Sequence, residues 1–200
     1  MPADTYSAQH RGGRGIIGMG TKDEDFIENV IAVNSHSYLL MFTNTGKVQA
    51  KKAYYIPEAG RTAKGQNLVN ILEGEKITAC ISVDAFDEEH YLTMVTRRGV
   101  IKRTPLKEYE YQRKGGKIAL NLDEGDELLF VGCTTGDCEL MLATRNGQAV
   151  RFHEENARVM GRTARGVRGI SLREGDEVVG VAVIEEGKEL LCVTENGFGK

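Results

Sequence analysis

Short apolar runs recur along the chain, and each ends in a Thr-x-x-Gly turn. The four runs are YLLMFTNTG, YLTMVTRRG, ELMLATRNG and ELLCVTENG, with their turns at residues 43–46, 96–99, 144–147 and 194–197. The runs are rich in Val, Leu, Met and Thr and have the length of β-strands. Glycine supplies the positive φ that a tight turn between two strands requires. The pattern predicts β-hairpins spaced about fifty residues apart.

A fixed order of features follows the first three turns. An alternating or basic run (KVQAKK, VIKRTP, QAVRFH) leads to a glycine-containing basic loop (GRTAKGQ, QRKGGK, GRTARGVRG). An acidic turn (ILEGEK, NLDEGDE, SLREGDE) and a further apolar strand (ITACISV, LLFVGCT, VVGVAVI) complete the unit. About four strands in about fifty residues are typical of a propeller blade. We therefore predict one all-β domain over residues 1–200, a propeller-like array of four-stranded blades.

Stacking of neighbouring units is part of this prediction, because a single blade cannot bury both of its faces. A pair of β-sandwiches is the alternative fold. It is disfavoured because sandwiches rarely carry a repeat this regular.

The charges alternate with the same period as the strands. The net charge is −3, which by itself argues against a nucleic-acid partner. However, residues 43–68, 96–117 and 144–168 are net positive, and residues 69–95, 118–143 and 169–193 are net negative. If the blades are equivalent, the basic segments emerge on one rim and the acidic turns lie elsewhere. A regular basic rim suits duplex DNA, which rewards spaced cations through counterion release.

The candidate rim residues are the lysines and arginines of these three basic segments. They are Lys47, Lys51, Lys52, Arg61, Lys64, Arg97, Arg98, Lys102, Arg103, Arg113, Lys114, Lys117, Arg145, Arg151, Arg162, Arg165 and Arg168.

The stretch QHRGGRGIIGMG at residues 9–20 contains Gly13, Gly15 and Gly18 in the spacing G-x-G-x-x-G. A dinucleotide site would need a buried strand before these glycines and a helix after them. The preceding MPADTYSA is too short and polar for that strand, and the following FIENVIAV is β-branched and strand-like rather than helical. The P-loop pattern G-x-x-x-x-G-K-S/T does not occur either. We interpret QHRGGRG instead as a basic loop equivalent to QRKGGK at residues 112–117.

This loop is the second group of candidate DNA-binding residues. Its arginines can form charge-assisted forks with phosphate oxygens, and its glycines leave backbone N–H groups accessible to phosphates. Nothing in it is suited to reading base edges, so we expect sequence-independent binding. The loop comprises Gln9, His10, Arg11, Gly12, Gly13, Arg14 and Gly15.

Other chemistry is sparse in the sequence. Cys80 and Cys192 lie in strand-like runs, and Cys133 and Cys138 flank a predicted hairpin turn. Only His153 is near these thiols, so we expect no metal site and reduced cysteines in a cytoplasmic protein. No apolar stretch approaches the ~20 residues of a membrane span, so we expect no membrane partner. Tyr38 and Tyr91 are expected to pack within the sheets, and no residue set suggests catalysis.

The chain resembles the C-terminal DNA-wrapping domain of the DNA gyrase A subunit. QHRGGRG is similar to that family's signature box, Q-R-R-G-G-K-G, with His10 replacing Arg and Arg14 replacing Lys. EDFIENVIAVNSHSYLLMFTNTGKV and YYIPEAGRTAKGQNLVNILEGEKITA are similar to its first two blade segments. The resemblance extends from Ser7 to the end of the chain. Topoisomerase IV subunits carry the box in degraded form or not at all.

The resemblance implies a six-bladed β-pinwheel whose blades exchange strands, of which this chain would be a fragment of about four blades. It implies that duplex DNA wraps chirally around the basic outer rim and so supports negative supercoiling. It further implies a parent type II topoisomerase, an isomerase in which the gyrase A N-terminal domain and gyrase B form a heterotetramer with this domain. ATP and Mg²⁺ would serve that full enzyme, with no cofactor and no catalytic residue in this domain.

Two alternatives stay open at this point. The C-terminal domain of the topoisomerase IV A subunit would bind DNA without strong wrapping. A propeller-type scaffold would bind acidic protein surfaces and is expected to use aromatic and arginine hot spots. The scaffold is disfavoured because aromatic residues make up 6% of the chain and tryptophan is absent.

Overall fold

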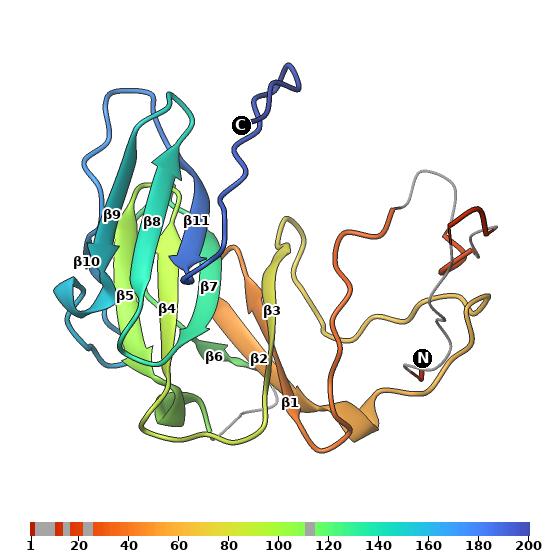
Figure 1. Ribbon diagram of the computed structural model, residues 1–200. Helices are drawn as coiled ribbons and strands as arrows, with labels where there is room; N and C mark the ends of the chain where they lie inside the picture. Colours follow the sequence, from red (N-terminus) through yellow and green to blue (C-terminus); the bar gives the residue numbers. More distant parts are fainter. Residues whose placement is uncertain (3–10, 14–16, 22–25, 111–114) are drawn as a thin grey trace.

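Three antiparallel sheets stand side by side in the computed structural model, which describes residues 1–2, 11–13, 17–21, 26–110 and 115–200 (Figure 1). We call them the first, second and third blade. In the order of hydrogen-bonded neighbours, the first blade consists of β3 (Ile77–Val83), β1 (Tyr38–Thr43), β2 (Lys47–Lys52) and β6 (Lys117–Ile118). The second consists of β7 (Leu128–Thr134), β4 (Tyr91–Thr96), β5 (Val100–Pro105) and β10 (Val167–Arg168). The third consists of β11 (Val178–Ile184), β8 (Glu139–Thr144) and β9 (Ala149–His153). The predicted all-β array of stacked blades is confirmed.

Strands are exchanged between neighbouring blades. The short strand β6 leaves the second repeat to pair with β2, with Val48 opposite Lys117. In the same way β10 leaves the third repeat to pair with β5, with Ile101 opposite Val167. Each of these two blades therefore closes its outer edge with a strand from the next repeat.

The exchanged strands lie on the outer side of the array. Strand β7 lies beside both β3 and β11, so these three strands line the inner side. The strand order of each sheet then places β6, β10 and β9 at the outer edges (Figure 1). The segments that contain β6 and β10, which we call the crossovers, are residues 115–122 and 160–168. The described parts of their glycine-containing basic loops therefore lie at the outer edges of the first and second blades.

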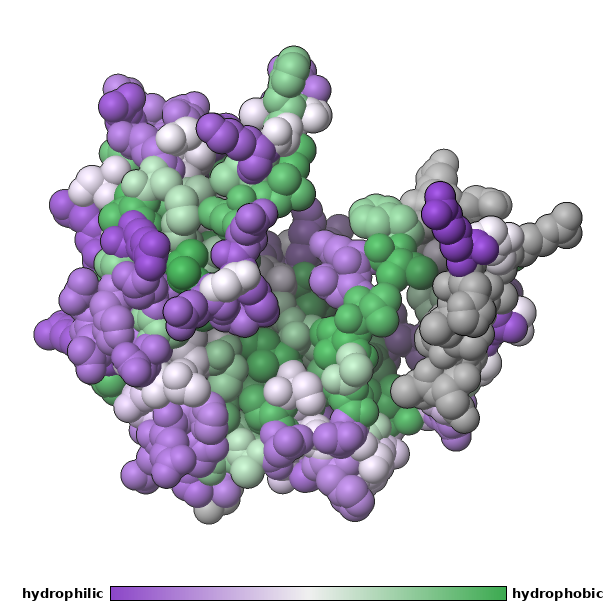
Figure 2. All heavy atoms as spheres, in the orientation of Figure 1, coloured by the Kyte–Doolittle hydropathy of each residue, from purple (hydrophilic) through white to green (hydrophobic). Residues whose placement is uncertain are grey.

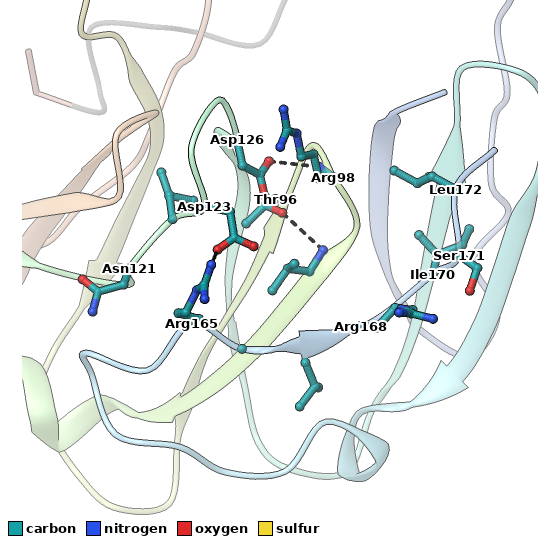
Figure 3. A pocket seen from close by; sticks show the side chains of 14 residues that line it. Thr96, Arg98, Asn121, Asp123, Asp126, Arg165, Arg168, Ile170, Ser171 and Leu172 are labelled. Atoms are coloured by element: carbon teal, nitrogen blue, oxygen red, sulfur yellow. Dashed lines mark hydrogen bonds and ion pairs between the residues drawn. The ribbon is translucent and has the colours of Figure 1, made fainter. Parts of the chain in front are cut away.

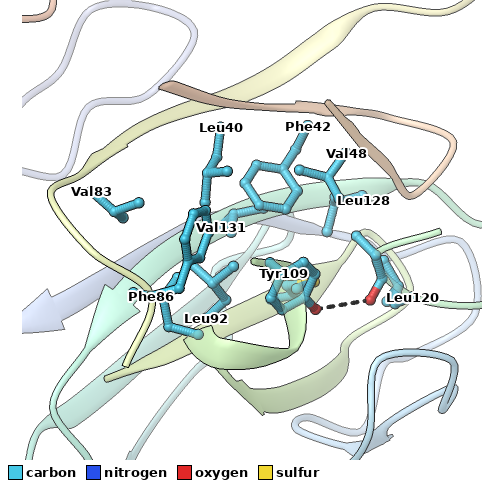
Figure 4. Packing of buried hydrophobic residues seen from close by; sticks show 13 residues of the cluster. Leu40, Phe42, Val48, Val83, Phe86, Leu92, Tyr109, Leu120, Leu128 and Val131 are labelled. Carbon is cyan, nitrogen blue, oxygen red and sulfur yellow. Dashed lines mark hydrogen bonds between the residues drawn. The ribbon is translucent and has the colours of Figure 1, made fainter. Parts of the chain in front are cut away.

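Two hydrophobic clusters join the blades. The cluster between the first and second blades includes Phe42, Leu92 and Tyr109, and the Tyr109 hydroxyl donates a hydrogen bond of 3.1 Å to the Ala119 carbonyl (Figure 4). The cluster between the second and third blades includes Val95, whose side chain faces the opposite side of β4 from Leu92. This alternation is expected of a strand that is buried on both faces.

Short 3₁₀ turns follow each outer hairpin strand and lead the chain toward the next segment. They are η2 (Ala53–Tyr55), η3 (Leu106–Tyr109) and η4 (Glu154–Asn156). Tyr38 and Tyr91 pack as predicted: the Tyr38 ring lies 4.8 Å from the ring of Phe86, and Tyr91 lies beneath the guanidinium of Arg103.

Two sequence predictions of strands are wrong. FIENVIAV forms no strand, and Val30 within it is 84% exposed. The turn at 194–197 is accompanied by a single bridge between Val193 and Gly199, and Cys192 is exposed outside any strand. Both segments have strand composition, but none of the described strands pairs with either of them, and a strand forms only where a partner supplies its hydrogen bonds.

None of the helical turns in the described part of the chain has the length and apolar character needed to cross a membrane. Within those same residues, no group of three His, Cys, Asp or Glu side chains is placed to hold a metal ion.

Candidate nucleic-acid interface

The glycines at the start of β6 and β10 let each crossover lie close to the blade that receives it. Gly116 and Gly166 have φ values of 79° and 105°. A Cβ on Gly166 would lie 2.6 Å from the Ile101 carbonyl oxygen, and one on Gly116 would lie 2.9 Å from the Val48 carbonyl oxygen. These glycines serve contact with the outer strand of the preceding blade, and that contact fixes where the basic side chains around them emerge.

Hydrogen bonds connect the two crossovers to each other. The Arg162 guanidinium donates to the Ile118 carbonyl at 2.6 Å, and the Asn121 side-chain amide donates to the Thr163 carbonyl at 2.6 Å. Asn121 was not among the sequence-predicted residues. The position of NLDEGDE directly after the basic loop was the only signal that could have suggested it.

A groove of about 600 Å³ lies between the two crossovers (Figure 3). Arg98, Arg165 and Arg168 line it together with Asp123 and Asp126. Arg165 forms an ion pair with Asp123, whereas the exposed side chain of Arg168 has no ion pair or hydrogen bond with any described residue. The groove therefore combines one neutralised and two un-neutralised arginines.

Three cations at or beside the Thr-x-x-Gly turns are paired with acids, whereas Arg98 in the turn at 96–99 is not. Lys47 lies 2.7 Å from Glu75, Arg97 lies 3.0 Å from Glu127 and 3.3 Å from Glu177, and Arg145 also pairs with Glu177. The expectation that the acidic turns lie away from the basic segments is therefore wrong at this end of the blades.

The strand register explains this pairing. Thr43 at the end of β1 is opposite Ile77 at the start of β3, so the acidic turn before β3 must lie beside the turn after β1. The N–H group of Leu72 holds the pKa of Glu75 down to about 2, and Lys47 and Thr45 contribute in the same direction. Glu75 is thus fully ionised at neutral pH and neutralises the turn cation.

Lys102 and Arg103 are not on the rim. Lys102 is 0% exposed and lies between the first and second blades, where its ammonium donates to the carbonyls of Ala119 (2.8 Å) and Arg162. Burial lowers the pKa of Lys102 to about 8, and the Arg162 charge adds to that effect.

Arg103 is 7% exposed and lies between the second and third blades, 3.7 Å from Glu154 and 4.8 Å above the Tyr91 ring. The prediction for both residues fails because β5 is covered on both faces, so even its polar side chains are enclosed.

The remaining described candidates differ in their partners. Lys52 lies 3.6 Å above the Tyr38 ring and donates to the His36 carbonyl at 2.7 Å. Arg61 and Arg98 donate to backbone carbonyls, and Arg151 is paired with Glu139. Backbone partners leave a positive charge un-neutralised, whereas a carboxylate cancels it.

Several candidates therefore keep their charge at the surface. Lys117 lies on the outer strand β6 and is not counted among them. Neither Lys51 nor Lys64 has an ion pair with any described residue. Together with Lys52, Arg61, Arg98, Arg162 and Arg168, these two lysines form the set that we call the rim cations.

Part of the predicted interface lies outside the described residues. Gln9, His10, Arg14, Gly15, Arg113 and Lys114 belong to that part. Arg11, Gly12 and Gly13 are described and exposed, and Gly12 has a φ of 83°.

Hydrophilic residues cover most of the side of the molecule that carries β9 and β10, while hydrophobic residues reach the surface toward β3 and the segment before β1 (Figure 2). The outer side is therefore suited to a charged, water-exposed partner.

The sequence matches the family model described as the DNA gyrase C-terminal domain, beta-propeller, over residues 1–34, 37–84, 90–135 and 139–185. It is 46% identical over 206 residues to the DNA gyrase A subunit of Staphylococcus epidermidis, covering 100% of this chain and 23% of that protein. It is 51% identical over 174 residues to the corresponding protein of Halalkalibacterium halodurans, covering 86% of this chain and 21% of that protein. The chain thus spans less than a quarter of the length of these relatives.

Two kinds of solved structure resemble the chain. The C-terminal domain of DNA topoisomerase IV matches with a TM-score of 0.82 at 32% identity, over 92% of this chain and 58% of that one. The DNA gyrase A C-terminal domain matches with a TM-score of 0.75 at 30% identity, over 100% of this chain and 65% of that one.

Proposed function

The chain belongs to the family of DNA gyrase C-terminal domains, and from this membership we propose that it binds duplex DNA without reading its sequence and wraps it around the outer rim of the blades. The observation that carries the proposal is the position of the two basic crossovers. Both cross the outer edge of a blade, and the β10 crossover presents Arg162 and Arg168, neither of which has a carboxylate partner among the described residues.

The rim cations would act on the phosphate backbone. Each lysine or arginine that neutralises a phosphate releases condensed counterions, and this term does not depend on base sequence. Bending a site of 20–30 bp costs on the order of 1–6 kcal/mol, so a curved rim must supply several such contacts in a row. Successive crossovers at the edges of neighbouring blades would provide that row.

The glycine-rich box extends this proposal to Gln9–Gly15. By repeat equivalence Gly13 corresponds to Gly116, which lies against the outer strand of the preceding blade. We infer that Arg11 and Arg14 flank a similar close contact and form forks with DNA phosphates.

The parent protein would be the A subunit of a type II topoisomerase. We propose that this domain acts there with the gyrase A N-terminal domain and with gyrase B, in the cytoplasm, and that ATP and Mg²⁺ are used by those other parts. Within this chain we assign no residue to catalysis.

A salt titration tests the binding mode. Between 50 mM and 200 mM salt, 6–10 phosphate contacts should weaken affinity by ~10³–10⁵. Two linear duplexes of unrelated sequence and equal length should give the same curve. A flat salt response, or a preference for one sequence that persists at high salt, would contradict backbone binding.

The match to topoisomerase IV supports a second candidate function, DNA binding without strong wrapping. A protein of that kind would give the same salt dependence and would leave the shape of the bound DNA unchanged. The two candidates are therefore separated by measurements of DNA shape rather than of affinity.

A further inference from the structure

Lys102 is a cation of a DNA-binding domain that cannot reach DNA. Its side chain is 0% exposed, and no carboxylate of the described residues lies within ion-pair distance. Its ammonium donates instead to the backbone carbonyls of Ala119 and Arg162. These two carbonyls belong to different crossovers: Ala119 directly follows β6, and Arg162 precedes β10.

A buried ammonium is a costly way to fill this position. Burial is the largest cause of the fall in its pKa to about 8, and the Arg162 charge lowers that pKa further. A methionine of similar length would fill the same space without a charge. A buried charge of this kind is retained in some proteins because it selects one arrangement of the chain.

We propose that Lys102 is a positioning residue that holds the two crossovers at a fixed spacing and so sets how far the bound DNA is bent. The inference rests on the proposed function. Other contacts act in the same place: Asn121 donates to Thr163, Arg162 donates to Ile118, and Tyr109 donates to Ala119. Lys102 differs from them because it connects both crossovers to the middle of β5.

The charge state of Lys102 should then affect the bend. The titratable groups that face it are Arg162 from the β10 crossover and Glu108 and Tyr109 from η3. Burial raises the pKa of Tyr109 above its usual value, so Tyr109 stays neutral. Lys102 loses its proton as the pH rises through about 8, and its hydrogen bonds then lose their charge assistance.

The experiment compares DNA bending with affinity. End-to-end energy transfer would be measured on a duplex of about 150 bp, which is one persistence length, at saturating protein. Lys102→Met should roughly halve the increase in energy transfer that protein binding causes. The dissociation constant for DNA should change by less than about threefold, because no phosphate contact is lost. The bend by the wild-type chain should decline as pH rises through about 8, and that of K102M should not.

Two further variants separate this role from a general loss of structure or charge. Asn121→Ala removes another bridge between the crossovers at an exposed position, and it should lower the bend in the same direction. Lys76→Met removes one exposed lysine outside both crossovers and should leave the bend unchanged.

Amide hydrogen exchange gives a readout that does not depend on DNA. In K102M the amides of Ala119 and Met160, which bond to Gly46 and Arg103, should exchange about tenfold faster as the crossovers loosen.

The outcomes distinguish this inference from the proposed function. If the wild-type chain does not bend DNA, the proposed function fails. If the wild type bends DNA and folded K102M bends it equally, with unchanged exchange, the positioning role is overturned. If K102M does not fold, the bending measurement on N121A takes its place. An unchanged DNA bend in N121A then overturns the positioning role.

Discussion

Gly166 combines a φ of 105° with a distance of only 2.6 Å from its virtual Cβ to the Ile101 carbonyl oxygen. Gly147 offers a matched comparison within the same chain. It also has a positive φ, 81°, but no atom lies within 4 Å of its virtual Cβ. The difference arises because β10 passes over the outer strand of the second blade, whereas none of the described strands passes over β9.

Replacing each of these glycines by alanine should therefore have unequal effects. Gly147→Ala is expected to cost on the order of 1–2 kcal/mol for the left-handed backbone alone. Gly166→Ala should cost about 1–3 kcal/mol more because the chain must also shift away from β5. Urea unfolding of both variants measures the difference. Equal losses would show that β10 does not need this close approach.

The buried Lys102 also leads to a prediction of how the free energy of unfolding changes with pH. Its pKa falls from 10.5 in the unfolded chain to about 8 in the fold, so between these values the unfolded chain binds more protons. The free energy of unfolding should therefore rise with pH in this window. From about pH 7 to about pH 9.5 the gain should be roughly 2 kcal/mol relative to Lys102→Met. Parallel urea unfolding curves for the two proteins at both pH values would contradict the buried, depressed lysine.

The crossovers could be predicted from the sequence only in part. The repeat of runs, turns and basic loops correctly predicted blades. It did not predict which strand each loop would join, because β6 and β10 are two residues long and carry no hydrophobic pattern of their own. It also treated Lys102 and Arg103 as surface residues, since charge in a strand usually indicates a solvated face.

The sequence also does not predict which cations pair with which acids. Lys47 and Glu75 are 28 residues apart in sequence, and only the register of β1 with β3 brings them to 2.7 Å. A count of charges along the chain shows alternation, but which charges remain un-neutralised depends on which turn lies beside which strand.

Because Arg168 is a rim cation and Arg173 is not, we expect their replacement to change the salt dependence of DNA binding unequally. Arg168→Ala removes an exposed cation from the outer strand β10 and should reduce the slope of log affinity against log salt by about 1. Arg173→Ala removes the same charge from the acidic turn that follows. It should leave that slope nearly unchanged, because Arg173 lies outside the rim cations. Fluorescence anisotropy across a salt series measures both slopes, and identical losses would mean that only net charge matters.

For the molecule as a whole, a net charge of −3 is compatible with binding a polyanion because the two signs occupy different environments. The acidic turns neutralise the hairpin turns at one end of the blades, while the rim cations keep their charge at the outer side. Strand exchange joins each blade to the next, and the buried clusters between the sheets fix their relative orientation. Under the proposed function, cations held in place by these contacts would impose a shape on DNA as well as bind it.

The handedness of bound DNA tests this account most directly. Closed circular plasmid would be relaxed by a type I topoisomerase in the presence of increasing amounts of the chain, and the linking number would be measured after the protein is removed. Wrapping around a rim of one fixed curvature predicts that the topoisomers shift progressively in a single direction. A distribution that stays centred on the relaxed position at saturating protein, in a salt range where binding is tight, would contradict wrapping.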